Sequence, residues 1–332
     1  MNRKVNNHNY KTEGVPVVFI FTKIMSMKIL VATEKAFAPV AISLIREVTE
    51  AAGYKLVLLE NYKNISELLT AVSDVDAIIV RSDMVTSEVL DAAKNLKIVV
   101  RAGAGYDNLD LPACTAHKVV AMNTPGQNSN AVAELAFEMM LYQARGGFSG
   151  KSGSELRGKM IGIHAFGNVG KYVAEIAKGF GMDIYAFDPF VNEADILKSG
   201  VKVCKDTEEL YSKCQYVSLH IPANDKTKKS IGYDLLKKMP KDAVLVNTAR
   251  KEVIDEEGLL KIFEERADFK YLSDVDPDCK ALFEEKYKGR FVFTAKKMGA
   301  QTEEANINAG VAAARQIVDY FKNGNEKFKL NK

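Results

Sequence analysis

Residues 159–189 constrain the fold more strongly than any other part of the chain. They comprise an apolar run, a small-residue turn at 165–170, an amphipathic segment and a second apolar run that ends at Asp188. A strand, a glycine turn, a helix and a second strand make up the βαβ unit that binds dinucleotides, because glycine lets the backbone approach a pyrophosphate and a helix N-terminus attracts anions. The stretch therefore predicts a parallel sheet flanked by helices, with a dinucleotide site at the turn.

The turn and the acidic residue together favour one cofactor. Asp188 follows the last glycine at close to the roughly 20-residue spacing of such folds, where a carboxylate accepts hydrogen bonds from ribose hydroxyls and repels a 2′-phosphate. We therefore expect NAD rather than NADP. The backbone at the pyrophosphate is expected to be that of Gly167, Asn168, Val169 and Gly170. Ala165 replaces the first glycine of the usual G-x-G-x-x-G pattern, so the turn alone could be an ordinary βα connection. The prediction of a dinucleotide site therefore depends on the strands, helix and acid that flank the turn.

Composition indicates a globular protein without a strong charge. Apolar residues make up 47% of the chain and charged residues 27%, and the formal net charge of +3 is too small to predict nucleic-acid binding. No apolar run approaches the roughly 18 residues of a membrane span, so we expect no membrane partner. The cysteines lack the spacing of zinc ligands or of paired thiols, which predicts reduced thiols, a cytoplasmic protein and no metal site. They are Cys114, Cys204, Cys214 and Cys279.

Residues 1–26 differ in character from the rest of the chain. They are polar apart from a short apolar run that Pro16 interrupts, and no small-residue cleavage site comes after it. We interpret them as an N-terminal extension or a loosely attached leader rather than a targeting signal. From Met27 onward, apolar runs alternate with helical segments, and the alternation resumes after the glycine turn. The fold class expected is therefore α/β, with two parallel sheets in series.

The end of the chain predicts how the two lobes are connected. The alanine-rich, amphipathic segment 303–321 follows the last strand of the second lobe, and we expect it to return to the first. The substrate-binding domain then comprises residues 27–124 and 304–332, and the NAD-binding Rossmann domain, residues 125–303, is inserted into it. Because Lys332 follows shortly after this segment, we expect no appended regulatory domain and no serine feedback through one.

Several blocks of the chain, in order, resemble the D-isomer-specific 2-hydroxyacid dehydrogenases, and among them the short D-3-phosphoglycerate dehydrogenases. The blocks are RAGAGYDNLD (101–110), NTPGQNSNAVAEL (123–135), the glycine turn, LHIPANDKT (219–227), NTARKEVIDEEGL (247–259), SDV (273–275) and KKMGAQTEEA (296–305). The resemblance implies two Rossmann/flavodoxin-like lobes with an active-site cleft between them. It also implies NAD-dependent oxidation of D-3-phosphoglycerate, the first step of phosphorylated serine biosynthesis, by a homodimer formed through the cofactor domain.

Oxidation of a 2-hydroxy acid requires a cation for the carboxylate, a group that takes up the hydroxyl proton, and a nicotinamide for the hydride. Arg250 ends an apolar run at the strand edge where open α/β sheets bind ligands, and its guanidinium can hold a carboxylate and the 2-oxygen together. A surface arginine paired with Glu252 or Asp255 is the alternative. The small-residue turn at 103–105 predicts an anion nest of backbone N–H groups for the carboxylate.

The resemblance assigns further residues to substrate and cofactor. Arg81 and Ser82 would bind the substrate phosphate, although a solvated strand end would look the same. The other substrate residues implied are Ala102, Gly103, Ala104, Gly105 and Asn108, with Asn128 and Gln301 as weaker candidates. Asp274 would hydrogen-bond the nicotinamide carboxamide. The remaining cofactor contacts implied are His220, Pro222, Thr227, Thr248 and Ala249.

Two departures from the family pattern concern proton transfer. Cys279 stands where the family carries a glutamate, and Lys297 where it carries a histidine, while the chain has no histidine after His220. We predict that Lys297 is the proton donor in ketone reduction and the acceptor in oxidation, with Lys296 as the alternative if the alignment shifts by one. Two other functions remain open, a reductase of glyoxylate, hydroxypyruvate or a D-lactate type, and an NAD-sensing binding protein without catalysis.

Overall fold

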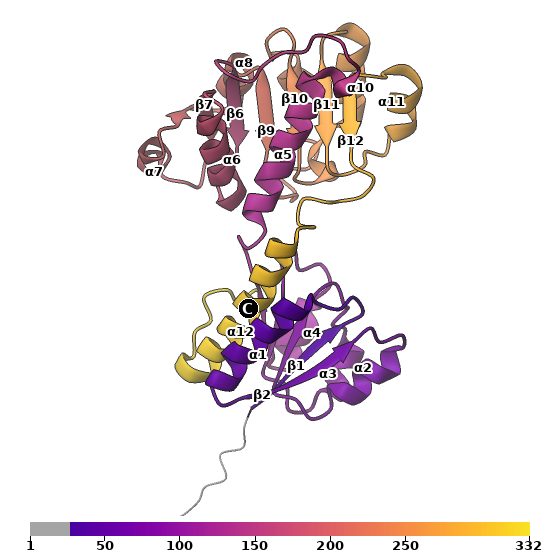
Figure 1. Ribbon diagram of the computed structural model, residues 1–332, viewed down its shortest axis with the longest axis vertical. Coiled ribbons are helices and arrows are strands. Elements are labelled where there is room, and N and C mark those ends of the chain that lie inside the picture. Colours follow the sequence, from indigo (N-terminus) through magenta and orange to yellow (C-terminus); the bar gives the residue numbers. More distant parts are fainter. Residues whose placement is uncertain (1–26) are drawn as a thin grey trace, which may run out of the picture.

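A computed structural model describes residues 27–332, which form two α/β lobes (Figure 1). The interpretation of residues 1–26 lies outside the described residues. The first lobe contains a five-stranded, all-parallel sheet of order β2-β1-β3-β4-β5, which is the flavodoxin-like order. Its strands are β1 (Lys28–Thr33), β2 (Lys55–Glu60), β3 (Ala77–Val80), β4 (Ile98–Arg101) and β5 (Val120–Asn123).

Helices cover both faces of this sheet. One face carries α1 (Pro39–Ala51) and α12 (Glu303–Asn323). The other carries α2 (Ile65–Ala71), α3 (Ser87–Ala92) and α4 (Leu111–Ala116). Because both faces are buried, the central strands are continuous apolar runs, as in β3 with all four residues buried.

The second lobe contains a seven-stranded, all-parallel sheet of order β12-β11-β10-β9-β6-β7-β8. Counted from β6, this is the order of dinucleotide-binding sheets. The strands are β6 (Met160–His164), β7 (Asp183–Phe187), β8 (Lys202–Val203), β9 (Tyr216–Leu219), β10 (Val244–Asn247), β11 (Lys270–Ser273) and β12 (Phe291–Phe293). The expected fold class, with two parallel sheets in series, is confirmed.

The helices of the second lobe also form two layers. One layer contains α5 (Ser129–Ala144), α6 (Asn168–Gly179) and α7 (Glu193–Lys198). The other contains α8 (Thr207–Lys213), α9 (Tyr233–Leu236), α10 (Glu256–Glu265) and α11 (Lys280–Lys286). Two short 3-10 helices, η1 (Gly146–Phe148) and η2 (Lys251–Val253), lie in connections. No helix within residues 27–332 has the length and apolar character to cross a bilayer.

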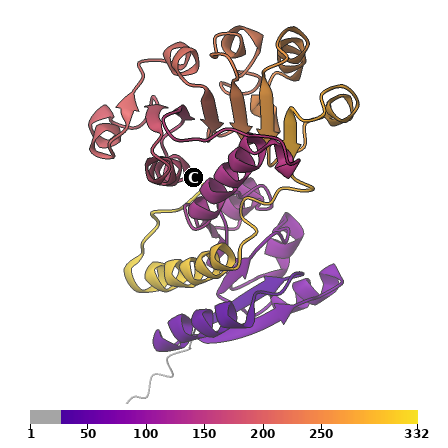
Figure 2. The same cartoon turned by 45° about the horizontal axis from the view of Figure 1, so that its top comes forward.

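The last helix returns from the second lobe to the first. In Figure 2, α12 lies along the first lobe beside α1, and its buried face packs on α1 and the sheet. Gly310 permits this close approach, since a side-chain carbon there would stand 3.0 Å from both Ile45 Cδ1 and Phe37 Cε1. Beyond α12, Leu330 and Asn331 hydrogen-bond Ala121 of β5, so the end of the chain covers that edge strand.

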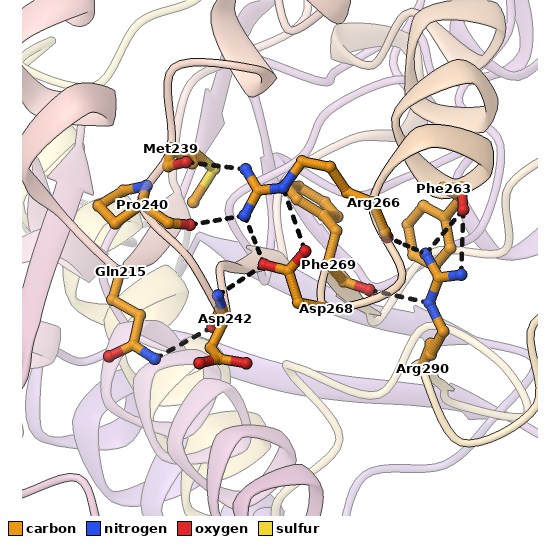
Figure 3. A network of polar contacts seen from close by, with 9 residues as sticks. All are labelled: Gln215, Met239, Pro240, Asp242, Phe263, Arg266, Asp268, Phe269 and Arg290. Atoms are coloured by element: carbon orange, nitrogen blue, oxygen red, sulfur yellow. Dashed lines mark hydrogen bonds and ion pairs between the residues drawn. The ribbon is translucent and has the colours of Figure 1, made fainter.

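A polar network ties the loops that precede β10, β11 and β12 (Figure 3). Arg266 donates to two main-chain carbonyls of the loop before β10 and pairs with Asp268 at 2.6 Å. Asp268 also accepts from the amide of Asp242 at 2.6 Å. Arg290 donates to the carbonyls of Phe263 and Arg266, and its guanidinium lies 4.3 Å from the ring centre of Phe263. This network braces the amino ends of the strands, opposite the edge at which ligands bind in such folds.

Candidate active site

The carboxyl edges of the two sheets face each other. Arg81 directly follows β3, and Arg250 lies just beyond β10. A side-chain carbon at Gly105, after β4, would lie 3.8 Å from Arg250 Nη2 of the other lobe. Likewise, a carbon at Gly126 would lie 3.1 Å from Asn168 Nδ2. Residues predicted for substrate and for cofactor are thus brought together at one place between the lobes.

The glycine turn joins β6 to α6 as expected for a pyrophosphate site. Gly167 is the N-cap of α6, and apart from its chain neighbours no atom of residues 27–332 lies within 4 Å of where its side-chain carbon would be. The first N–H groups of a helix lack partners within it, so those of Asn168, Val169 and Gly170 are oriented toward this open space. At Gly170 a side-chain carbon would stand 2.4 Å from the carbonyl oxygen of Ala165, so close packing of helix on strand requires glycine here.

Asp188 is fixed at the tip of β7 by the turn itself. Its Oδ2 accepts from the amide of Phe166 and its Oδ1 from the amide of Phe190, both at 2.8 Å. Each carboxylate oxygen has two lone pairs, so the group retains capacity for two ribose hydroxyls.

Two histidines are packed beneath the turn in neutral form. Burial lowers the pKa of His164 to about 4, and its Nδ1 lies 3.2 Å from the hydroxyl of Tyr211. Burial, together with neighbouring His164, lowers the pKa of His220 to about 3, and its Nε2 lies 3.0 Å from Ser218 Oγ. With so low a pKa, and with its Nε2 next to Ser218, His220 is too weak a proton acceptor to be the base of the reaction.

The loop after β9 is closed by its own residues. The hydroxyl of Thr227 donates to the carbonyl of Pro222 at 2.5 Å and accepts from the amide of Asn224 at 2.8 Å. Thr227 therefore shapes the loop rather than pointing to a ligand.

Two buried hydroxyls within residues 27–332 have no hydrogen bond, those of Thr124 and Thr248, and Thr248 lies at the end of β10. Thr248 is only 6% exposed, and its Oγ1 has no hydrogen bond among residues 27–332. An unpaired buried hydroxyl costs about 1–3 kcal/mol, which a ligand at this edge would recover. This orphan group, the open N-terminus of α6 and the free lone pairs of Asp188 fit NAD. Bound NAD would supply the hydride acceptor for oxidation of the substrate.

The buried carboxylate of Asp274 is hydrogen-bonded by groups of the protein itself. The residue is 1% exposed, and its carboxylate accepts from the amides of Met298 and Gly299 at 2.6 and 2.8 Å and from the hydroxyl of Thr294 at 3.1 Å. These bonds hold the backbone immediately after Lys297. A predicted bond to the nicotinamide carboxamide would use the remaining lone pair.

A third arginine, which the sequence analysis did not single out, joins the site. Arg101 ends β4, donates from Nε to the carbonyl of Arg81 at 3.0 Å, and lies over Gly103. A side-chain carbon at Gly103, whose φ is +153°, would be 1.7 Å from Arg101 Nη1, so glycine is required. Burial lowers the pKa of Arg101, as do Arg81 and Arg250, while Asp107 raises it. Its position at a strand end, directly before the predicted nest, was the available sequence signal.

Neutral groups hold the guanidinium of Arg81. Its Nη1 donates to the carbonyls of Lys35 and Ala36 at 3.0 and 3.1 Å, and its Nη2 to Asn306 Oδ1 at 2.7 Å. Burial lowers its pKa, whereas Asp83 raises it. The guanidinium of Arg81 is therefore oriented without an ion pair among residues 27–332, while the main-chain amide of Arg81 donates to Asp83 Oδ2 at 3.2 Å. Ser82 beside it is exposed.

The loop after β4 is braced by amide side chains. Asn108 Nδ2 donates to the carbonyl of Asp83 at 2.7 Å, and Asn123 Nδ2 to that of Ala104 at 2.6 Å. Asn128 is the N-cap of α5, and the exposed Gln301 donates its main-chain N–H to the carbonyl of Met298.

Lys297 contacts the strand end that carries Arg250. Its Nζ donates to the carbonyl of Ala249 at 3.4 Å, and Arg250 Nη1 donates to the same oxygen at 2.9 Å. Lys297 is exposed as a residue, and its ammonium is partly desolvated by the surrounding protein. This desolvation and Arg250 lower the pKa of Lys297, while Asp274, Asp107 and Glu252 raise it. Lys296 is exposed, and its carbonyl oxygen lies 2.8 Å from the hydroxyl of Thr294, which shares its single proton between this oxygen and Asp274.

Comparison with known proteins places this site in a family. Residues 131–281 match the D-isomer specific 2-hydroxyacid dehydrogenase, NAD binding domain. The hydroxypyruvate reductase of Thermotoga maritima is 34% identical over 76% of this chain and 86% of its own length. This chain belongs to the D-isomer-specific 2-hydroxyacid dehydrogenases. It uses the NAD-binding domain of that family, so the predictions of family and cofactor are confirmed.

Other members of the family define the relationship further. A D-3-phosphoglycerate dehydrogenase of Methanocaldococcus jannaschii is 35% identical over 76% of this chain, and the chain spans about half (51%) of that relative's length. The NAD⁺-bound 3-phosphoglycerate dehydrogenase of Entamoeba histolytica is 50% identical, with a TM-score of 0.80 over 92% of this chain and 99% of that one. D-2-hydroxyisocaproate dehydrogenase, 19% identical with a TM-score of 0.76, shares the fold.

Position 279, where the resemblance to the family implied a glutamate, carries an uncharged cysteine. The amides of Cys279 and Asp278 both donate to the carboxylate of Glu256 at 2.8 Å. Burial, with Glu256 adjacent, raises the pKa of the Cys279 thiol to about 12. The thiol is therefore protonated near neutral pH and cannot balance an ammonium.

Proposed function

We propose that the protein catalyses the NAD-dependent oxidation of D-3-phosphoglycerate to 3-phosphohydroxypyruvate, and the reverse reduction. The observation that carries the proposal is the convergence of Arg81, Arg101, Arg250 and Lys297 at the facing strand edges, with none of them ion-paired within residues 27–332. The substrate has a carboxylate and a phosphate, with about three negative charges in total near neutral pH. A site built for a singly charged 2-keto acid would have less use for four cations.

Each cation has a task in this proposal. Arg250 binds the carboxylate and polarises the 2-oxygen, together with the N–H groups of the 103–105 turn. Arg81 and Arg101, at the ends of adjacent strands, bind the phosphate. Bound NAD would be held by the α6 N-terminus, Asp188, Thr248 and Asp274.

Lys297 moves the proton in this scheme. In ketone reduction its ammonium donates a proton to the developing alkoxide, and in oxidation its neutral amine takes the hydroxyl proton. A free lysine has a pKa near 10.4, so a base working near neutrality needs a lowered value. The desolvation and the neighbouring Arg250 seen here act in that direction.

The first test compares substrates with NADH. We expect kcat/KM for phosphohydroxypyruvate to exceed that for hydroxypyruvate, glyoxylate and pyruvate by at least about 100-fold, because each charge-assisted hydrogen bond contributes roughly 1.5–3 kcal/mol. Lys297→Ala should lower kcat by about 10²–10⁴-fold. Lys296→Ala is the matched control and should retain most of kcat. A near-normal kcat with a raised KM in Lys297→Ala would reduce that residue to steering of the substrate.

A reductase of unphosphorylated 2-keto acids is the second candidate. The relative named hydroxypyruvate reductase is matched over 86% of its length. In addition, several N–H groups of the Arg81 guanidinium already donate to protein acceptors rather than being open to a phosphate. Equal kcat/KM on hydroxypyruvate and phosphohydroxypyruvate would favour this function. An NAD-sensing binding protein would bind NADH and turn over none of these substrates.

The organisation of the molecule is part of the same proposal. The domain limits at 27–124 with 304–332, and at 125–303, follow the two sheets and the return of α12. A homodimer formed through the cofactor domain and a cytoplasmic role in serine biosynthesis complete it.

A further inference from the structure

A buried acid lies directly beside Arg81, the residue proposed to bind the substrate phosphate. Asp83 comes two residues after Arg81 at the end of β3, and only 5% of its surface is exposed. Its carboxylate accepts hydrogen bonds from neutral groups and makes no ion pair within residues 27–332. A negative charge this close to a phosphate site disfavours the ligand unless it does something for the cation.

Three donors from three segments hold this carboxylate. Its Oδ1 accepts from the amide of Glu34, in the loop after β1, at 2.7 Å and from the hydroxyl of Tyr62, after β2, at 2.9 Å. Its Oδ2 accepts from the amide of Arg81 at 3.2 Å. Burial and the bond to Asp83 raise the pKa of Tyr62, so the phenol stays protonated and able to donate. Asp83 thereby joins the ends of β2, β1 and β3, which are neighbours in the sheet.

The loop that Asp83 fixes in turn holds the guanidinium of Arg81. Arg81 Nη1 donates to the carbonyls of Lys35 and Ala36 at 3.0 and 3.1 Å, and these two residues directly follow Glu34. The contacts form a closed ring from the carboxylate of Asp83 through the loop to the guanidinium, and back through the amide of Arg81. Displacement of the loop would therefore release the guanidinium.

Further contacts leave one part of the guanidinium open. The amide of Phe37 donates to Glu60 Oε1 at 3.1 Å, and the ring centre of Phe37 lies 5.1 Å from Arg81 Cζ. Arg81 Nη2 donates to Asn306 Oδ1 at 2.7 Å. Arginine has five N–H groups, and the hydrogen bonds of Arg81 within residues 27–332 engage three of them. The Nε–H and one N–H of Nη2 remain, and such a pair of donors can bind two oxygens of a phosphate.

We propose that Asp83 positions Arg81 for the substrate phosphate, with Tyr62 as its supporting donor. The carboxylate does not touch the substrate, and it acts by fixing the loop 34–37, whose carbonyls set the direction of the guanidinium. A guanidinium that is already oriented loses less side-chain entropy when it binds. Asp83 is therefore a positioning residue that determines specificity, and the inference rests on the proposed phosphate-binding role of Arg81.

Two substitutions weaken this support to different degrees. Tyr62→Phe removes one donor and keeps the packed ring, which is 6% exposed. Asp83→Asn removes the charge and sets an amide NH₂ group against one of the three N–H or O–H donors. Tyr54→Phe is the matched control, because Tyr54 lies at the other end of β2, where its ring packs on Phe321 with ring centres 5.7 Å apart.

The first measurement is steady-state kinetics with NADH. We expect Tyr62→Phe to raise KM for phosphohydroxypyruvate by about 3–10-fold with little change in kcat, and Asp83→Asn to raise it by about 10-fold or more. The control should match the wild type, and kcat/KM for hydroxypyruvate should change far less. In an Arg81→Ala background both substitutions should have almost no further effect, because residues that act through one another are not additive. Equal losses with and without Arg81, or on both substrates, would assign Asp83 to the scaffold alone.

The second measurement follows the guanidinium without any substrate. In the full-length enzyme with ¹⁵N-labelled arginine, NMR exchange spectra report how fast the two Nη groups of Arg81 interchange by rotation about the Nε–Cζ bond. The signals are assigned by their absence in Arg81→Lys. We expect slow rotation in the wild type and in Tyr54→Phe, and several-fold faster rotation in Asp83→Asn. Rotation that is equally slow in Asp83→Asn, or already fast in the wild type, overturns the inference.

The proposed function can fail separately. If the wild type shows no preference for phosphohydroxypyruvate, the proposed function is wrong, and the rotation rates alone decide whether Asp83 orients Arg81. If the preference is present but neither variant alters KM or the rotation rate, only the positioning role of Asp83 is wrong. If Asp83→Asn does not fold, the same two measurements on Tyr62→Phe decide.

Discussion

At the scale of single residues, Ala165 has a backbone conformation that is unfavourable for a residue with a side chain. It stands in the glycine turn with φ of +80°, a conformation that costs a residue with a side chain roughly 1–2 kcal/mol. Ala165→Gly removes this strain but makes the unfolded chain more flexible, which costs about 0.4–1 kcal/mol. We expect a net rise in the free energy of unfolding of up to about 1 kcal/mol, measured by urea denaturation. Gly167→Ala, at a position of negative φ, is the control, and a loss of stability in Ala165→Gly would contradict the expectation.

A second prediction at the scale of single residues is that Arg81 determines the preference for a phosphorylated substrate. Arg81→Ala should lower kcat/KM for phosphohydroxypyruvate by roughly 10–150-fold, because a charge-assisted contact worth about 1.5–3 kcal/mol is lost. Residual activity on hydroxypyruvate should change little. Arg46→Ala, which removes an exposed arginine of α1 that pairs with Glu50 at 3.1 Å, is the matched control. An equal loss on both substrates would assign Arg81 to the scaffold, through its bonds to Lys35, Ala36 and Asn306.

Single site residues could be predicted from the sequence where they belong to a short local pattern. The glycine turn with Asp188 was recognisable because turn, helix start and acid lie within one βαβ unit. Arg101 was missed because an arginine at a strand end has many uses, and only its position over Gly103 and beside Arg81 reveals its surroundings. The position of Gly105 relative to Arg250 was likewise out of reach, since the sequence does not specify how two lobes face each other.

At the scale of elements, the contact between α1 and α12 depends on one small residue. Gly310 faces Phe37 and Ile45 at 3.0 Å from where its side-chain carbon would be. Gly310→Leu gains about 1 kcal/mol of helix propensity but overpacks this contact, which costs typically 1–3 kcal/mol. We expect lower stability in thermal unfolding. Gly179→Ala is the control and should be neutral or stabilising, because outside its own helix backbone no atom of residues 27–332 lies within 4 Å of the new carbon.

The elements themselves were largely predictable because of how they are buried. Strands such as β3 and β10 have both faces covered, so each is an unbroken apolar run that is easily seen in the sequence. The edge strand β8 has only two residues and leaves no pattern. Arg266 and Arg290 bind mainly to main-chain carbonyls of residues that are distant in sequence. Because every residue has such a carbonyl, no side-chain pattern predicts this network.

At the scale of the whole molecule, stability should depend on pH through buried groups near the cofactor turn. Burial lowers the pKa of His164 to about 4 and that of His220 to about 3, below the unfolded value near 6.5. The unfolded chain therefore binds more protons below pH 6.5, and stability must fall as the pH falls from there toward 4. Below pH 4 the loss continues, because Arg266 holds the pKa of Asp268 at about 2.

A single substitution tests whether buried histidines cause the loss of stability in acid. His164→Gln removes one of the two buried titrating rings, so the free energy of unfolding should fall less steeply between pH 6.5 and 4.5, by about one bound proton in the slope. His117 supplies a control of opposite sign: its bond to Asp91 raises its pKa, so it stabilises the fold at low pH and loses that effect as the pH rises. His117→Gln should therefore leave the slope between pH 6.5 and 4.5 nearly unchanged and remove the decrease in stability that the wild type shows as the pH rises above 6.5. Urea denaturation at five pH values measures both slopes, and identical slopes in His164→Gln and the wild type would show that the buried ring does not govern acid stability.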